Sequence, residues 1–203
     1  MLNVYLLRHG ETQWNADGNK YCGRTDIALT KKGISQAELV RDQLKHISFD
    51  AVYSSPLQRA LTTAQIASGR IDVITDERLI EVNFGNWEGK TREEFIAEDA
   101  SLWKNWCDNP SQSKAGGTGE TALEVVKRVN DFYESVLKKH PSGNILSVGH
   151  NGINRLYLSY KLGMNLKDYR RIVQENSSIT LFSLDVSTAE ITLKLLNSSL
   201  KYL

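Results

Sequence analysis

Short apolar runs of strand-forming residues recur along the chain, and polar or glycine-containing segments bound each of them. Runs of this length and composition predict buried strands. The predicted strands cover residues 3–7, 51–53, 71–75, 145–148, 179–184 and 191–196.

Amphipathic stretches between these runs predict helices, because their apolar residues recur on one helical side. A capping box at Thr121 and Glu124 opens one of them. Another follows Ser54-Ser55-Pro56, interpreted as a serine cap with proline in the first turn, and Gly69 ends it. The predicted helices cover residues 32–46, about 56–68, about 122–139 and about 153–162.

Strands that alternate with helices predict a mainly parallel α/β sheet covered on both faces. The 203 residues suffice for one domain with a sizeable core, so we expect a single domain over 1–203. The segment 83–119 has a poor hydrophobic pattern and is rich in polar residues, Trp and Gly. This composition predicts an inserted segment of helices and loops that serves as a lid.

The net charge of +1 gives no strong field toward nucleic acid or an anionic membrane, so neither is expected as a partner. No apolar run approaches the ~20 residues that span a bilayer, and the start lacks the features of a signal peptide. We therefore expect a cytoplasmic protein, monomeric or homodimeric. Cys22 and Cys107 form no CxxC pair, so neither a disulfide framework nor a zinc site is expected.

Basic side chains follow three of the predicted strands. Arg8 and His9 end the first, Arg59 lies one turn into the helix after the second, and His150 follows a third. The carboxyl ends of parallel strands meet at one edge of a sheet, where ligands bind. Two arginines and two histidines would therefore share one crevice, as in an anion site.

This set suits the transfer of a phosphoryl group. Arginine forks bind phosphoryl oxygens in pairs, and nearby positive charge keeps an imidazole neutral and nucleophilic. Four protein cations would supply the charge that a metal otherwise supplies, so no metal or other cofactor is expected. Glu81, which follows the third predicted strand, is the best candidate to protonate the leaving oxygen. Each residue alone has a structural interpretation; only the joint pattern favours catalysis.

The motifs resemble the histidine phosphatase superfamily, which includes phosphoglycerate mutases and several phosphatases. Segments in the family's order span most of the chain, and together they form a specific signal. They are Leu7-Arg8-His9-Gly10-Glu11-Thr12 with Trp14-Asn15, Gly23-Arg24-Thr25-Asp26, Ser54-Ser55-Pro56-Leu57-Gln58-Arg59-Ala60, Leu79-Ile80-Glu81, Gly85-Asn86-Trp87-Glu88-Gly89 and Val148-Gly149-His150-Asn151-Gly152.

The resemblance implies a phosphoglycerate mutase-like three-layer α/β/α sandwich with a mixed, mainly parallel sheet. It also implies roles for matching residues. His9 would be the phosphorylated nucleophile and Glu81 the proton donor. The implied phosphate- and substrate-binding residues are Arg8, Asn15, Cys22, Gly23, Arg59, His150 and Asn151.

Hydrolysis of a small phosphorylated substrate is favoured over the alternative, a phosphoglycerate mutase. Mutases of the family carry extra basic residues in their insertion, whereas here the Arg170-Arg171 pair lies outside it, in an expected surface loop or helix. The compact length and Phe84-Gly85-Asn86-Trp87-Glu88 resemble bacterial α-ribazole phosphatases. An inactive phospho-ligand binding module is the alternative of another class, disfavoured because His9 and Glu81 are present.

Tryptophans gather in the predicted lid. Trp87, Trp103 and Trp106 would either stack on a flat substrate group or pack the lid against the core. Packing is the favoured interpretation of the two.

Overall fold

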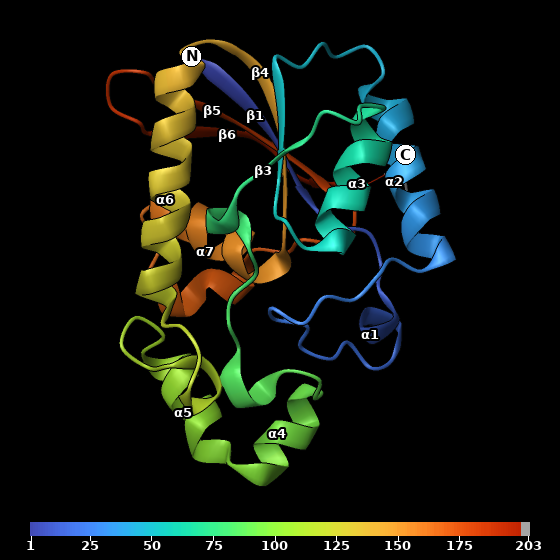
Figure 1. Cartoon of the computed structure of the whole chain (residues 1–203). Helices are drawn as coiled ribbons and strands as arrows, with labels where there is room; N and C mark the ends of the chain where they lie inside the picture. The colour runs from blue at the N-terminus through green and yellow to red at the C-terminus, as the bar shows by residue number, and fades with distance from the viewer. Residues whose placement is uncertain (200–203) are drawn as a thin grey trace.

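A computed structural model describes residues 1–199 and confirms the predicted three-layer architecture (Figure 1). Six strands form one sheet in the order β3-β2-β4-β1-β5-β6. The strands are β1 (Leu2–Arg8), β2 (Ala51–Ser54), β3 (Ile74–Thr75), β4 (Gly143–Gly149), β5 (Ile179–Leu184) and β6 (Ile191–Ser198). Strands β1 to β4 run parallel to one another, whereas β5 pairs antiparallel with β1 and β6 pairs antiparallel with β5. The sheet is therefore mixed and mainly parallel.

The register of the two central strands places the predicted site. β1 pairs with β4 from Leu2 opposite Gly143 to Arg8 opposite Gly149. Both strands therefore end at the same level of the sheet. The His9 N–H donates to the Gly149 carbonyl at 3.1 Å, which carries the pairing one residue further.

Successive residues of a strand point to opposite faces of the sheet, and the central strands have apolar residues on both faces. Helices therefore cover both faces. On one face α2 (Lys31–Leu44) and α3 (Gln58–Ser68) pack on Leu7, Val52 and Val148. On the other face α6 (Ala122–Lys139) and α7 (Asn151–Lys161) pack on a second cluster that contains Leu2, Val4, Leu6, Tyr53 and Ile145.

The segment 83–119 lies at the end of the molecule opposite the N-terminus (Figure 1). It contains two short 3-10 turns, η2 (Gly85–Trp87) and η3 (Ala115–Gly117), and two helices, α4 (Arg92–Glu98) and α5 (Ala100–Asp108). Trp87 is 2% exposed and stacks on Phe95 at 4.6 Å between ring centroids, and Trp106 is fully buried. Trp106 donates its Nε1–H to the Tyr169 hydroxyl at 3.2 Å, and both tryptophans belong to the core cluster under α6 and α7. These two therefore pack the segment against the core, as expected, and its role as a lid stays a prediction.

Two local expectations were wrong, and one element was missed. Helix α3 begins at Gln58 with Leu57 as its N-cap, and the Gln58 N–H is capped from outside the helix by Asp26 at 2.9 Å. The third strand contains only Ile74 and Thr75, an exposed edge that pairs with the end of β2. The sequence pattern also missed the one-turn helix α1 (Gln13–Ala16), which is too short to show a period. It is followed in the chain by α2.

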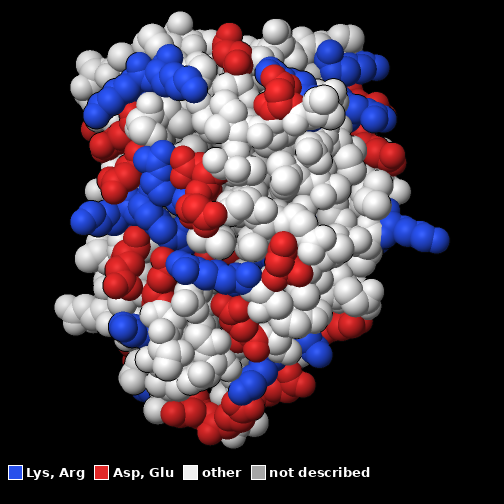
Figure 2. Space-filling model, in the orientation of Figure 1, with Lys and Arg blue, Asp and Glu red and all other residues white. Residues whose placement is uncertain are grey.

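Charges of both signs share the surface. On the face in Figure 2, Lys and Arg side chains are interspersed with Asp and Glu side chains. Among the described residues, no helix is long and apolar enough to cross a membrane. Both cysteines are free thiols, Cys22 buried and Cys107 half-buried.

Candidate active site

His9 lies directly after β1 and is 3% exposed. Its Nδ1–H donates to the Gly10 carbonyl at 2.7 Å, since a carbonyl can only accept. This bond fixes the tautomer in which Nε2 carries a lone pair. A Cβ at Gly10 would lie 2.4 Å from the Gly33 carbonyl oxygen, so only glycine allows this close turn.

The pKa of His9 lies well below its usual value. Burial is the largest cause, followed by the charges of Arg59 and Arg8. The sequence predicted the direction from the nearby charge, but desolvation contributes more. The imidazole is therefore neutral at neutral pH, with Nε2 free to act as a nucleophile.

Arg59 lies in the first turn of α3 and is completely buried. Its two Nη groups donate to the carbonyls of Thr25 and Gly23 at 2.8 and 2.7 Å, while Nε has no partner among residues 1–199. Gly23 has φ +50°, and a Cβ there would meet the Glu88 carboxylate at 2.0 Å. Gly23 thus holds Arg59 through its carbonyl, and it does not line the cavity described below.

His150 is the N-cap of α7, and its ring lies 5.1 Å from that of His9 between centroids. It is fully buried, and neither ring nitrogen has a partner within the described chain. Burial, Arg59 and His9 hold its pKa well below the usual value. The expectation of four cations is therefore corrected. Two arginines of the site are charged and two histidines are neutral, because burial penalises the imidazolium form.

Arg8 ends β1 and is 9% exposed. One Nη donates to the Gln174 carbonyl at 3.0 Å, and its Nε has no partner within residues 1–199. Burial lowers its pKa to about 10, so it stays charged at neutral pH. An unpaired buried donor costs about 1–3 kcal/mol. A bound anion would satisfy Arg8, Arg59 and His150 together.

Glu81 reaches the same site from a segment outside any helix or strand. Its carboxylate accepts the backbone N–H groups of Gly152 at 3.1 Å, Ile153 at 3.1 Å and its own neighbour Val82 at 2.9 Å. The first two belong to the N-terminus of α7, an end that favours negative charge. Helix α7 therefore fixes the carboxylate beside His150 and Asn151.

Asn15 is positioned by a capping box. It accepts from the Thr12 N–H at 3.1 Å and from Asn176 Nδ2 at 3.3 Å through its side-chain oxygen. Its amide group lines the cavity, as do Cys22 and Asn151. Burial raises the pKa of the Cys22 thiol, which makes it a neutral wall residue.

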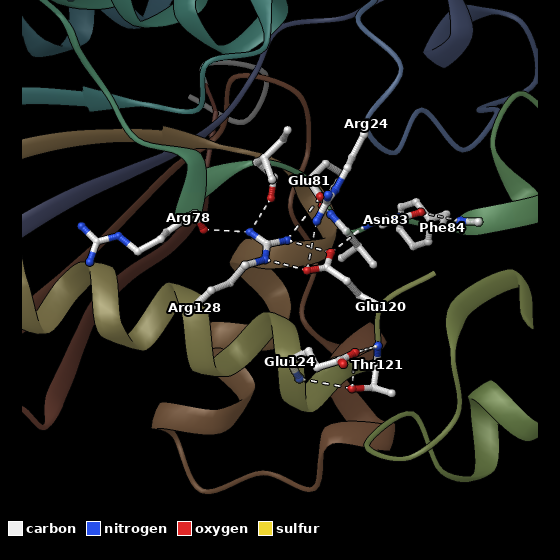
Figure 3. A network of polar contacts seen from close by, with 12 residues as sticks. Arg24, Arg78, Glu81, Asn83, Phe84, Glu120, Thr121, Glu124 and Arg128 are labelled. Atoms are coloured by element: carbon white, nitrogen blue, oxygen red, sulfur yellow. Dashed lines mark hydrogen bonds and ion pairs between the residues drawn. The ribbon is translucent and has the colours of Figure 1, made fainter. Parts of the chain in front are cut away.

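A polar network supports the 3-10 turn η1 (Glu77–Leu79) and the residues that lead from it into Glu81 (Figure 3). Arg128 of α6 donates to the carbonyls of Arg78 and Ile80, both at 2.7 Å, and to the Glu81 carbonyl at 3.2 Å. Its Nε and Nη2 also bind Glu120 at 2.9 and 3.1 Å. Arg128 thus holds the backbone that carries the Glu81 carboxylate.

Arg8, His9, Asn15, Cys22, Glu81 and Asn151 line one cavity of about 380 Å³. Arg59 and His150 are fully buried and are not among the residues that line it. The sequence missed several lining residues: Lys20, Tyr21, Arg92, Arg155, Tyr169 and Arg170. Arg170 corrects an expectation, because it lies in the cavity and not on a remote surface element. Arg155 had a local signal, since it is one helical turn beyond Asn151 on α7.

No cluster of three or more His, Cys, Asp or Glu side chains that could hold a metal occurs in residues 1–199. The cationic groups that face the cavity are arginines and a lysine. These side chains suit an anion.

Comparisons with known proteins agree with the geometry. The family model of the histidine phosphatase superfamily (branch 1) matches residues 4–198. Phosphoserine phosphatase 1 of Hydrogenobacter thermophilus is 32% identical over 187 residues, 91% of this chain and 88% of its own. Adenosylcobalamin/α-ribazole phosphatase of Escherichia coli is 32% identical over 199 residues, 97% of this chain and 96% of its own.

A solved structure has the same fold over the whole length. The crystal structure of a phosphoserine phosphatase mutant from Entamoeba histolytica in complex with phosphoserine matches with a TM-score of 0.89 and 33% identity. The match covers 100% of both chains.

Proposed function

Because the chain belongs to the histidine phosphatase superfamily, we propose that it is a metal-independent phosphomonoesterase acting through a phosphohistidine on His9. The observation that carries this proposal is the neutral His9 ring, whose Nδ1–H is fixed on Gly10 and whose Nε2 is free. The substrate is a small phosphorylated metabolite, since the cavity lies at the small end of the ~300–1,000 Å³ typical of ligand sites.

In the first step Nε2 attacks phosphorus, the P–N bond forms and the ester P–O bond breaks. The leaving alkoxide takes a proton from the Glu81 carboxylic acid. In the second step Glu81, now a carboxylate, accepts a proton from water, the water oxygen bonds to phosphorus and the P–N bond breaks. The products are an alcohol and inorganic phosphate, and His9 and Glu81 return to their starting states.

Arg8, Arg59 and His150 bind the phosphoryl oxygens in this scheme. Their unpartnered donors, the Nε groups of both arginines and a ring N–H of His150, are the atoms that would do so. Charge that develops on these oxygens is stabilised by donors already in place. The side-chain amide of Asn15 adds a further donor from α1.

The test is to trap the intermediate. Wild-type protein incubated with a ³²P-labelled phosphomonoester in EDTA should give an acid-labile, alkali-stable phosphoenzyme, and His9→Ala should give none. Glu81→Gln should slow hydrolysis by about 10²–10⁴-fold, because it loses the proton donor. An acid-stable phosphoenzyme, or turnover near wild type in His9→Ala, would overturn the proposal.

The relatives' names suggest two kinds of substrate. The sequence resemblance and the Escherichia coli relative favour α-ribazole 5′-phosphate, whereas the other two relatives favour phosphoserine. Stacking of a flat base has limited support, because only Trp103 of the three tryptophans lines the cavity. The Arg170 guanidinium lies 4.3 Å from the centre of that ring.

A phosphoglycerate mutase is the second candidate, and one observation favours it. Arg155 and Arg170 line the cavity, so the chain has the additional cations that a second anionic group requires. A mutase would return the phosphoryl group to substrate, whereas a phosphatase releases it. Comparing phosphate release with formation of 2-phosphoglycerate from 3-phosphoglycerate separates the two.

A further inference from the structure

The cavity as a whole is strongly basic. Its lining contains five cationic side chains, Arg8, Lys20, Arg92, Arg155 and Arg170. Glu81 is the single carboxylate among the lining residues of the described chain. This local excess contrasts with the net charge of +1 of the whole sequence. The cavity therefore has more positive charge than one phosphoryl group needs.

Arg155 and Arg170 lack the carboxylate partners that several other arginines have. Arg24, Arg78 and Arg128 each pair with a carboxylate. Neither Arg155 nor Arg170 takes part in an ion pair within residues 1–199. Both are only partly exposed, so solvent screens their charges incompletely.

Their hydrogen bonds are weak or missing. Arg155 donates to the Tyr169 carbonyl at 3.3 Å and to the Asn151 side chain at 3.5 Å, both near the limit of a hydrogen bond. Arg170 donates to the Cys107 sulfur at 3.7 Å, and its buried Nη2 has no partner in the described chain. Donor capacity is thus left over in this part of the cavity.

Aromatic rings hold both guanidinium groups without neutralising them. The Tyr169 ring centre lies 5.2 Å from Arg155 and 4.7 Å from Arg170, and Trp103 packs on Arg170. Burial lowers the pKa of Arg155, and the charge of Arg170 lowers it further against the opposing effect of Tyr169. Two positively charged guanidinium groups therefore lie against the same Tyr169 ring, and a bound anion would stabilise this arrangement.

We propose that Arg155 and Arg170 form a second anion-binding subsite and that the substrate is a small phosphomonoester bearing a carboxylate. The proposal rests on the proposed hydrolytic function for its other end, where Arg8, Arg59 and His150 take the phosphoryl group. A planar guanidinium offers two parallel N–H groups to the two oxygens of a carboxylate. Lys20 and Arg92 line the same cavity and add positive potential.

Matched ligand pairs test the carboxylate directly. O-phosphoserine and O-phosphoethanolamine differ only by that group. In the second pair, glycerol 3-phosphate has a hydroxymethyl group where 3-phosphoglycerate has its carboxylate. Binding measured by calorimetry in a His9→Ala background needs no turnover. It should favour the carboxylated member by about 10-fold to 100-fold, as expected for charge-assisted hydrogen bonds.

Variants assign the preference to the subsite. Arg170→Met and Arg155→Met should each reduce the ratio of the two dissociation constants toward one, while Arg170→Lys should retain part of it. Arg171→Met is the control, because Arg171 is exposed and does not line the cavity. It should leave both constants unchanged. Thermal unfolding shows whether each variant is folded.

The outcomes separate this proposal from the hydrolytic one. Equal affinity within each pair, or an unchanged ratio in both folded Arg→Met variants, overturns the subsite even if wild-type protein hydrolyses phosphomonoesters. Tightest binding of α-ribazole 5′-phosphate or of a bisphosphate also overturns it. A carboxylate preference lost in the Arg→Met variants supports the subsite, even if no phosphohistidine forms.

Discussion

At the scale of single residues, the chemistry depends on how burial changes the charge of His9. The ring is enclosed by protein, and two arginine charges act on it, so the imidazolium form is disfavoured. Its Nδ1–H bond to Gly10 then selects one neutral tautomer. A histidine exposed to water and without these neighbours would be half-charged near pH 6.5.

The protonation state of His9 should therefore stay constant through mildly acidic pH. In ¹⁵N NMR of histidine-labelled protein, the His9 ring should show the neutral Nδ1–H tautomer at pH 6.5, with protonation only at lower pH. Protein unfolded in urea gives the reference titration, and loss of the signals in His9→Asn assigns them. An imidazolium pattern for His9 at pH 6.5 would contradict the assigned cause.

The same shift links pH to stability with a definite sign. Below about pH 6.5 the unfolded chain binds protons at His9 and His150 that the folded chain does not bind, because both folded pKa values are lowered. The free energy of unfolding should therefore decrease as the pH falls below about 6.5, and these two histidines should cost no stability above that pH.

At the scale of elements, helix α6 acts on the site without touching the cavity. Arg128 joins α6 to three backbone carbonyls, those of Arg78, Ile80 and Glu81, and Glu120 completes the network (Figure 3). Glu120 also accepts the Asn83 N–H at 2.8 Å on the other side of Glu81. The backbone of the proton donor is thus held on both sides.

Arg128→Met should misplace Glu81 while leaving the phosphoryl-binding groups in place. We expect kcat for an alkyl phosphate to fall by about 10-fold to 100-fold with little change in KM, on the order of what misplacing a catalytic group costs. The loss should be smaller for p-nitrophenyl phosphate, whose leaving group needs no proton. Lys127→Met, at an exposed neighbouring position of α6, is the control. Equal losses on both substrates would contradict a positioning role.

Elements with strong local signals were predicted well from the sequence. The Thr121 capping box marks the start of α6, and the apolar run after it gives its buried face, both as observed. Short or edge elements were not, because tertiary contacts decide them. Asp26, which lies 32 residues earlier in the chain, caps α3, and no local pattern shows that.

Some residues of the candidate site could likewise be predicted from the sequence, and others could not. Residues at strand ends, such as His9 and His150, could be placed from topology alone, because parallel strands end at one edge. Arg155 and Arg170 could not, since their approach depends on how the turn η4 (Leu166–Arg171) packs beside α7. The sequence therefore predicted the phosphoryl end of the cavity and missed its opposite wall.

At the scale of the whole molecule, stability and chemistry reside in different parts of the same strand. Leu2 and Arg8 are the two ends of β1, about 20 Å apart at the ~3.3 Å rise per residue of a strand. Leu2 is fully buried in the cluster under α6 and α7. Truncation there removes core contacts far from the cavity.

Leu2→Ala should lower the free energy of unfolding by about 2–5 kcal/mol, the usual cost of such a truncation in a core. Below the melting temperature kcat should stay as in wild type. Leu39→Ala, at a position 48% exposed, should change stability by less than about 0.5 kcal/mol. Urea unfolding monitored by circular dichroism measures both. A loss under 1 kcal/mol at Leu2 would argue against its burial.

The division of the cavity between two sets of elements has a consequence for how such a protein diverges. The groups around His9 lie at strand ends and in the first turn of α3, where a substitution would disturb buried core residues. The opposite wall is built from α7, the turn η4 and the segment after Asn83, and its side chains Arg92, Arg155 and Arg170 are exposed or half-buried. Substitutions in that wall can therefore exchange one metabolite for another while the reaction is inherited unchanged, so descendants of one ancestor come to serve different pathways.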